Sequence, residues 1–144
     1  PSIIIAGHGT AEEEVIQILS NSSIDVEFIG KFTQDELPKL IERISVMYAV
    51  YPVTRGNILE GAIPTKMFDA AAGGRPSVVN NKCLMGDIAI AENIGYPISS
   101  NNFIELLDTL TAIKEDGIQV KLERDWNGEA SRLIEAYKRF VSNS

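Results

Sequence analysis

Short apolar runs alternate along the chain with segments in which apolar residues recur every three or four positions. The short runs predict buried β-strands, and the recurring spacing is that of one face of an α-helix. Predicted strands lie at residues 2–6, 26–29, 46–51, 77–80 and 95–98. Predicted helices follow Thr10, Thr33 and Asn102 and span residues 64–72, 85–93 and 127–141. This alternation indicates a Rossmann-like α/β fold, with a mostly parallel sheet and helices on both faces.

Local signals mark the ends and faces of these segments. The run Ser2–Ala6 is apolar throughout, as in a strand that is buried on both faces. Three helix starts carry a polar cap followed three residues later by a glutamate, namely Thr10 with Glu13, Thr33 with Glu36, and Asn102 with Glu105. Pro64 fits the first helical position, where its missing N–H costs nothing. The helix after Asn102 has one apolar stripe, formed by Phe103, Leu106, Leu107, Leu110 and Ile113.

Composition narrows the class of protein. The 144 residues suit one domain, so we expect a single domain over residues 1–144. A net charge of −7 disfavours nucleic acid as a partner, because such binding rests on neutralising phosphates. The one cysteine, Cys83, allows no internal disulfide and no cysteine metal cage. The sequence shows neither a signal peptide nor a run of about 20 apolar residues, and we therefore expect a cytoplasmic protein.

Ligands of open parallel sheets bind beyond the carboxyl ends of the strands. The candidate loops are therefore 7–10, 30–33, 52–64 and 80–86. The first contains Gly7, His8 and Gly9, which resemble part of a phosphate loop. The third glycine of the dinucleotide fingerprint is absent, because Glu12 stands there and further acids follow it. A tight strand-to-helix turn is therefore the simpler interpretation, with His8 kept as a candidate ligand contact.

The helix that follows Pro64 carries a cation in its first turn. Lys66 opposes the helix dipole there, which makes sense if an anionic ligand docks at this helix end, beside the N–H groups of Thr65 and Lys66. The alternative is an exposed lysine that pairs with Asp69 at i, i+3. The Asp69 carboxylate suits the two hydroxyls of a ribose, and its alternative is a partly exposed acid that pairs with a neighbour.

The loop over residues 52–63 adds further polar candidates. Arg55 can hold a phosphate through its guanidinium fork, and Asn57 or Glu60 can accept from sugar hydroxyls. A solvated loop is the alternative for each of them. The sequence has no P-loop, no nucleophile elbow and no histidine pair for zinc, so we expect neither a metal nor a cofactor.

In their order along the chain, these features resemble one family. A strand ending in Ala6-Gly7-His8-Gly9 leads to a strand ending in Tyr51-Pro52, and then to the stretch Pro64-Thr65-Lys66-Met67-Phe68-Asp69-Ala70-Ala71-Ala72-Gly73-Gly74-Arg75-Pro76. The chain resembles the C-terminal domain of family-4-type GT-B glycosyltransferases, in the branch with a P-x-K-x-F-D/E stretch followed by A-x-G-x-P. The resemblance covers nearly the whole chain, and its specific part is the Pro64–Pro76 segment.

The resemblance implies a nucleoside-diphosphate-sugar donor as substrate, with transfer of the sugar to an acceptor. It implies donor contacts from the loop with Gly7, His8 and Gly9, and from Thr65, Lys66 and Asp69. To these we add Arg55 and Asn57 as donor-binding candidates from the chemistry of their loop. Asp69 matches the family's second acid, which is usually glutamate and holds the ribose hydroxyls. Glu60 resembles the first, catalytic acid, but eight residues separate it from Asp69 where the family has seven, and Asn57 or Thr54 are alternatives.

The resemblance also implies a partner for this domain. Family members place an N-terminal acceptor domain across the cleft, in the same or a partner chain, and the acceptor can be membrane-associated, with peripheral attachment through that domain. In the family, the C-terminal domain itself begins with one further strand and helix, which carry an R…K pair for the diphosphate. This strand is central in the strand order 3-2-1-4-5-6. We therefore expect this chain alone to be inactive. Two other interpretations stay open, a stand-alone flavodoxin-like binding or signalling domain and a non-catalytic transferase subunit.

Overall fold

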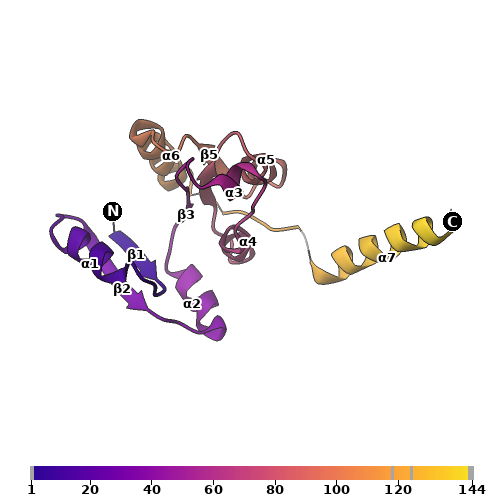
Figure 1. Cartoon of the computed structure of the whole chain (residues 1–144), viewed down its shortest axis with the longest axis horizontal. Coiled ribbons are helices and arrows are strands. Elements are labelled where there is room, and N and C mark those ends of the chain that lie inside the picture. Colours follow the sequence, from indigo (N-terminus) through magenta and orange to yellow (C-terminus); the bar gives the residue numbers. More distant parts are fainter. Residues whose placement is uncertain (1, 118, 124, 143–144) are drawn as a thin grey trace. The chain divides into compact units, whose positions relative to one another are not determined.

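The computed structural model describes residues 2–117, 119–123 and 125–142. Its backbone contacts divide the chain into two compact units, Pro1–Ile44 and Ser45–Ser144. All strands pair in parallel, which confirms the α/β class with parallel sheets (Figure 1). The strands form two sheets, one in each unit, and the prediction of a single domain over residues 1–144 stays a prediction.

The first unit is a strand, helix, strand arrangement followed by a short helix. Its elements are β1 (Ser2–Ala6), α1 (Glu12–Ser20), β2 (Asp25–Gly30), the 3₁₀ turn η1 (Gln34–Glu36) and α2 (Leu37–Glu42). β1 and β2 pair in parallel from Ser2 opposite Asp25, and the register shifts between Ile5 and Ala6. Ile41 is the one buried residue among the described residues of this unit.

Two predictions in this unit are wrong. β1 was expected to be buried on both faces, but its residues are exposed or half-buried and Ile3 is 39% exposed, because β1 pairs only with β2. The predicted cap of Thr10 with Glu13 does not form, because α1 begins one residue later and has Ala11 at its N-cap without a side-chain bond. The cap of Thr33 with Glu36 is confirmed, and it starts η1.

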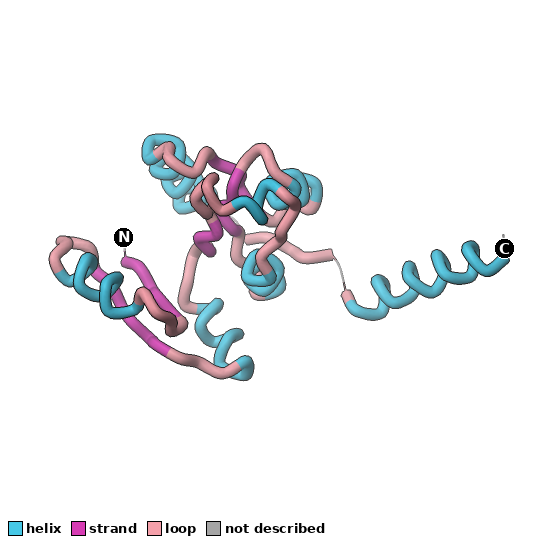
Figure 2. Tube along the Cα trace, in the orientation of Figure 1, coloured by secondary structure: helices cyan, strands magenta, loops and turns pink. Residues whose placement is uncertain are grey.

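The second unit is built on a sheet of three parallel strands in the order β3-β4-β5. Figure 2 draws the strands in magenta. Its elements are β3 (Met47–Ala49), α3 (Gly56–Leu59), α4 (Thr65–Ala72), β4 (Ser77–Asn80), α5 (Leu84–Ala91), β5 (Gly95–Ile98), α6 (Phe103–Asp116) and α7 (Trp126–Ser142). The predicted bounds of β4 and β5 are confirmed. Residues 52–63 were predicted to be a loop and contain α3, a helix of 4 residues that is too short to leave a periodic signal.

β4 is the central strand of this sheet and is buried on both faces. The side chains of Val78 and Val79 are both fully buried, and successive side chains of a strand point to opposite faces. Val79 belongs to a core with residues of α4 and α5, whereas Val78 packs with Ile113 of α6. Helices therefore cover both faces of this sheet, as the sequence predicts.

The helix α6 confirms its predicted cap, since Asn102 Oδ1 accepts from the backbone N–H of Glu105 at 3.1 Å. Its predicted apolar stripe is only partly buried. Ile113 is buried and packs on the sheet, while Phe103 and Leu107 are exposed by 77% and 63%. Of the stripe, Ile113 belongs to the core and Leu106 and Leu110 pack against it.

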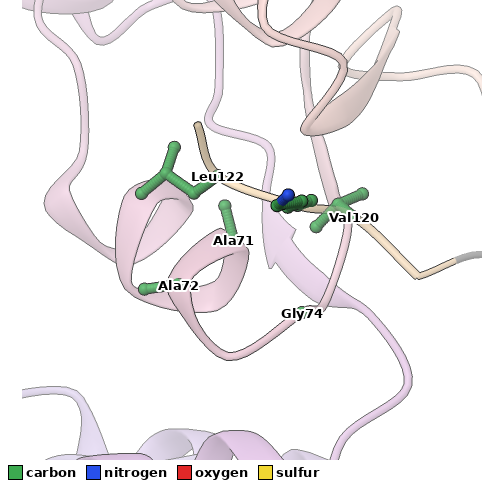
Figure 3. Close-up of a pocket in the computed structure, with 6 residues that line it drawn as sticks. Ala71, Ala72, Gly74, Val120 and Leu122 are labelled. Carbon is green, nitrogen blue, oxygen red and sulfur yellow. The ribbon is translucent and has the colours of Figure 1, made fainter. Parts of the chain in front are cut away.

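The last turn of α4 borders an open hollow of about 320 Å³ (Figure 3). Its lining residues are Ala71, Ala72, Gly74, Val120, Lys121 and Leu122. The segment at Val120 crosses here, and its N–H donates to the carbonyl of Gly74 at 3.3 Å. Small and apolar side chains predominate, and the hollow lies at the end of α4 remote from Lys66.

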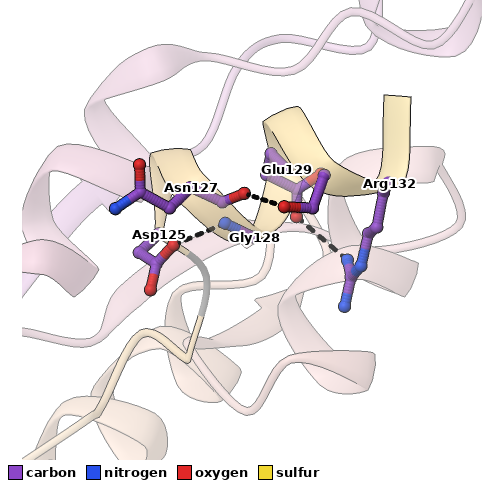
Figure 4. A network of polar contacts seen from close by, with 6 residues as sticks. Asp125, Asn127, Gly128, Glu129 and Arg132 are labelled. Atoms are coloured by element: carbon purple, nitrogen blue, oxygen red, sulfur yellow. Dashed lines mark hydrogen bonds and ion pairs between the residues drawn. The ribbon is translucent and has the colours of Figure 1, made fainter. Parts of the chain in front are cut away.

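The helix α7 begins with a polar network (Figure 4). The carboxylate of Asp125 accepts from the backbone N–H of Gly128 at 2.6 Å, and Arg132 pairs with Glu129 at 2.9 Å. One face of α7 carries exposed apolar side chains, namely Leu133, Ile134, Tyr137, Phe140 and Val141. The predicted amphipathic helix over residues 127–141 is thus confirmed.

Candidate functional site

The carboxyl end of β3 gathers two cations on one aromatic ring. The Arg55 guanidinium carbon lies 5.0 Å from the centre of the Tyr51 ring, and the Lys66 ammonium nitrogen lies 4.9 Å from it. Both distances are within the range of a cation–π interaction. We call Tyr51, Arg55 and Lys66 the cation cluster. The cluster brings together Arg55 and Lys66, which are both predicted site residues. Tyr51 was predicted only to end a strand, not to belong to the site.

Local backbone structure places these side chains. β3 ends at Ala49, and Pro52 begins a turn in which the Arg55 N–H donates to the Pro52 carbonyl at 3.0 Å. Arg55 then occupies the N-cap of α3. Pro64, which was predicted to be the first helical residue, is instead the N-cap of α4, because its ψ of 131° is extended. Lys66 remains in the first turn of α4, as predicted.

The Lys66 ammonium donates to the backbone carbonyl of Tyr48 at 2.9 Å. The alternative in which Lys66 pairs with Asp69 is wrong, since no ion pair joins them within the described residues. Neither Arg55 nor Lys66 forms an ion pair in that part of the chain. The cluster is therefore a local concentration of unneutralised positive charge in a chain of net charge −7.

Asn80 fixes the backbone that carries the ring. The N–H of Tyr51 donates to Asn80 Oδ1 at 2.8 Å, and Asn80 Nδ2 donates to the carbonyl of Tyr51 at 2.8 Å. Asn80 is buried at the end of β4, with 4% of its surface exposed. Sequence reasoning missed this residue, although an amide that ends a buried strand is a signal that could have identified it.

Asp69 lies one turn into α4 and is half-buried. Desolvation by burial raises the pKa of its carboxyl above the ordinary value of an aspartate. Within the described part of the chain, its carboxylate has neither a hydrogen-bond partner nor an ion-pair partner. A half-buried acid without a donor suits a ligand that brings hydroxyl groups.

The other candidates in this unit do not join the cation cluster through any side-chain hydrogen bond or ion pair of the described residues. Thr54, Asn57, Glu60 and Thr65 are all exposed. Glu60 is the C-cap of α3, and Asn57 lies within that helix. The formation of α3 thus displaces both from the extended loop that the sequence predicts, and no contact gives Glu60 a catalytic partner.

Gly7, His8 and Gly9 lie in the first unit, where they line a hollow of about 280 Å³. The N–H of Gly7 donates to the carbonyl of Gly30 at 2.7 Å, and Gly7 adopts a φ of +130°, which favours glycine. Glu12 also lines the hollow, whose apolar lining includes Phe28. Because the lining includes the acid Glu12 and the Gly7 N–H is already bonded to Gly30 at the end of β2, this hollow suits a neutral group better than a phosphate.

No group of three or more metal-binding side chains occurs among the described residues. Within the same residues, no helix is both long enough and apolar enough to cross a membrane. Cys83 is buried, and its thiol donates to the Asn80 carbonyl at 3.4 Å. The features that could contact a ligand are therefore the cation cluster, Asp69 and the glycine-lined hollow.

Comparison with known proteins gives no assignment: no family model, no curated protein and no solved structure matches the chain.

Proposed function

We propose that this chain is the donor-binding domain of a glycosyltransferase, with a nucleoside-diphosphate sugar as its ligand. The observation that carries the proposal is the cation cluster at the carboxyl end of β3, next to the first turn of α4. Arg55 and Lys66 offer two positive charges without a carboxylate partner, which suits a diphosphate. The half-buried Asp69, in the same helix as Lys66, suits the two hydroxyls of a ribose.

The arrangement suits the chemistry of sugar transfer. Transfer breaks the bond between the anomeric carbon and the phosphate oxygen of the donor and forms a bond from that carbon to the acceptor. Negative charge develops on the diphosphate, which departs with the oxygen. Cations that are held in place before the reaction stabilise such charge without reorganising. Arg55 and Lys66 would perform this role. The resemblance adds that transfer retains the anomeric configuration, needs no metal, and uses an acceptor held by another domain.

Ligand-observed NMR tests the proposal. The full chain is titrated with UDP, GDP and their sugar conjugates, alongside Asp69→Asn and the matched control Asp108→Asn, an exposed acid of α6. We expect selective binding of one nucleotide family, weakened in Asp69→Asn and unchanged in Asp108→Asn. Equal binding in all three proteins would remove Asp69 from the site. No binding of any nucleotide would count against donor binding by this chain.

A further inference from the structure

The Asn80 side chain continues the sheet beyond the point where its backbone ladder stops. β3 and β4 pair until Ala49 lies opposite Val79, and β4 ends at Asn80. Tyr51 would next need a backbone partner. The amide of Asn80 supplies one, because it accepts from the Tyr51 N–H and donates to the Tyr51 carbonyl, both at 2.8 Å. A carboxamide has the donor and acceptor of a peptide group, so this clamp fixes Tyr51 as a strand neighbour would.

The Tyr51 ring in turn fixes the two cations. Arg55 lies 5.0 Å and Lys66 lies 4.9 Å from the ring centre. Two cations on one ring repel each other, and within the described residues no carboxylate neutralises them. Lys66 is held additionally by the Tyr48 carbonyl of β3 at 2.9 Å. The path of the chain from β3 to Tyr51 therefore sets the position of both charges.

We propose that Asn80 is a positioning residue for a diphosphate-binding site formed by Arg55 and Lys66 on the Tyr51 ring. The inference rests on the proposed function and goes beyond it by naming the clamp that orders its diphosphate site. Two adjacent phosphoryl groups match two adjacent cations, one a planar fork and one a point charge. Loss of the clamp frees Tyr51, and the cations then lose their common support.

The experiment measures the affinity of the full chain for inorganic pyrophosphate by calorimetry, together with hydrogen exchange of the Tyr51 amide by NMR. Asn80→Ala removes both clamp bonds. Asn81→Ala is the matched control, because its neighbouring amide donates instead to the Ser99 hydroxyl at 3.1 Å. We expect Asn80→Ala to weaken pyrophosphate binding about tenfold and to accelerate Tyr51 exchange. Asn81→Ala should change neither.

A second pair of variants keeps the proposal testable if Asn80→Ala folds poorly. Tyr51→Leu removes the ring and should weaken pyrophosphate binding, and Tyr51→Phe, which puts a ring back, should restore most of it. Wild-type affinity in a folded Asn80→Ala protein, or in Tyr51→Leu, would overturn the positioning role. Failure of the wild-type chain to bind pyrophosphate would overturn the diphosphate site. If the chain binds pyrophosphate but no nucleotide sugar, the site stands and the proposed function fails.

Discussion

Gly86 of α5 lies against the backbone carbonyl of Asn80 at the end of β4. A Cβ added at Gly86 would be 2.6 Å from that oxygen, closer than two such atoms can approach. The helix can therefore pack on β4 only if this position has no side chain. The contact links the packing of α5 to the residue that clamps Tyr51.

We predict that Gly86→Ala destabilises the second unit by about 1–3 kcal/mol, because the backbone must shift to relieve the overlap. Gly56→Ala is the control, since a Cβ at Gly56 meets nothing within 4 Å. Urea unfolding of both variants checks the prediction. Unchanged stability of Gly86→Ala would show that the contact of α5 with β4 is looser than described.

Removal of the Ser77 hydroxyl is expected to leave the stability of the fold unchanged or to increase it. Its hydroxyl is fully buried at the start of β4 and has no hydrogen-bond partner in the described part of the chain. Because Ser77→Ala removes an unsatisfied polar group, we expect it to be neutral or to stabilise the fold by up to about 1 kcal/mol. Ser99→Ala provides the contrast, because it breaks the bond from Asn81 and should cost about 0.5–1.5 kcal/mol. Thermal unfolding compares the two, and a clear loss of stability in Ser77→Ala would contradict the prediction.

The capping box at Thr33 shifts the pKa of Glu36. Hydrogen bonds from the backbone N–H of Thr33, and then from its hydroxyl, lower the pKa of Glu36 below its ordinary value. The stability that Glu36 contributes is therefore present above its unfolded-state pKa and is lost as the pH falls through the lowered one. Thr33→Ala removes only the hydroxyl bond, so we expect the pKa of Glu36 to rise part of the way back. NMR titration of the Glu36 carboxyl measures this, and no change would exclude the hydroxyl bond.

The pKa of Asp69 is shifted in the opposite direction to that of Glu36. Burial raises its folded-state pKa, so the folded chain holds this proton more tightly than the unfolded chain does. Stability is consequently lost as the pH rises from the unfolded-state pKa of Asp69 to the folded-state one. Asp69→Asn should therefore be more stable than wild type at neutral pH, and this advantage should disappear below the ordinary pKa of an aspartate. Urea unfolding at both pH values, with Asp108→Asn as control, checks the sign.

Sequence reasoning predicted the regular elements well where one signal dominated. The bounds of β1, β4 and β5 were predicted to the residue, and each strand is followed by a residue that ends an apolar run, namely Gly7, Asn81 and Ser99. β3 was predicted too long, since its pattern continues to Tyr51 whereas its backbone partner ends at Asn80. Beyond that point the Asn80 side chain, not a backbone neighbour, bonds Tyr51. The pattern of apolar residues carries no sign of this.

The candidate site was only partly predictable. Arg55 and Lys66 were identified from charge and from position in the chain, and the structure brings both to Tyr51. The roles of Tyr51 and Asn80 depend on contacts between residues that are 29 positions apart, which a single sequence does not reveal. Glu60 was proposed from its resemblance to the family's first acid, although its spacing to Asp69 differs by one residue, and α3 leaves it exposed without a partner among the described residues.

Residue-resolved NMR of the labelled chain during titration with the tightest nucleotide sugar tests the central claim most directly. We predict that the signals of Tyr51, Arg55, Lys66 and Asp69 shift together with one affinity, and that those of residues 120–122 beside the hollow of Figure 3 stay in place. Shifts confined to residues 120–122, or none at all in the cation cluster at saturating ligand, would contradict it.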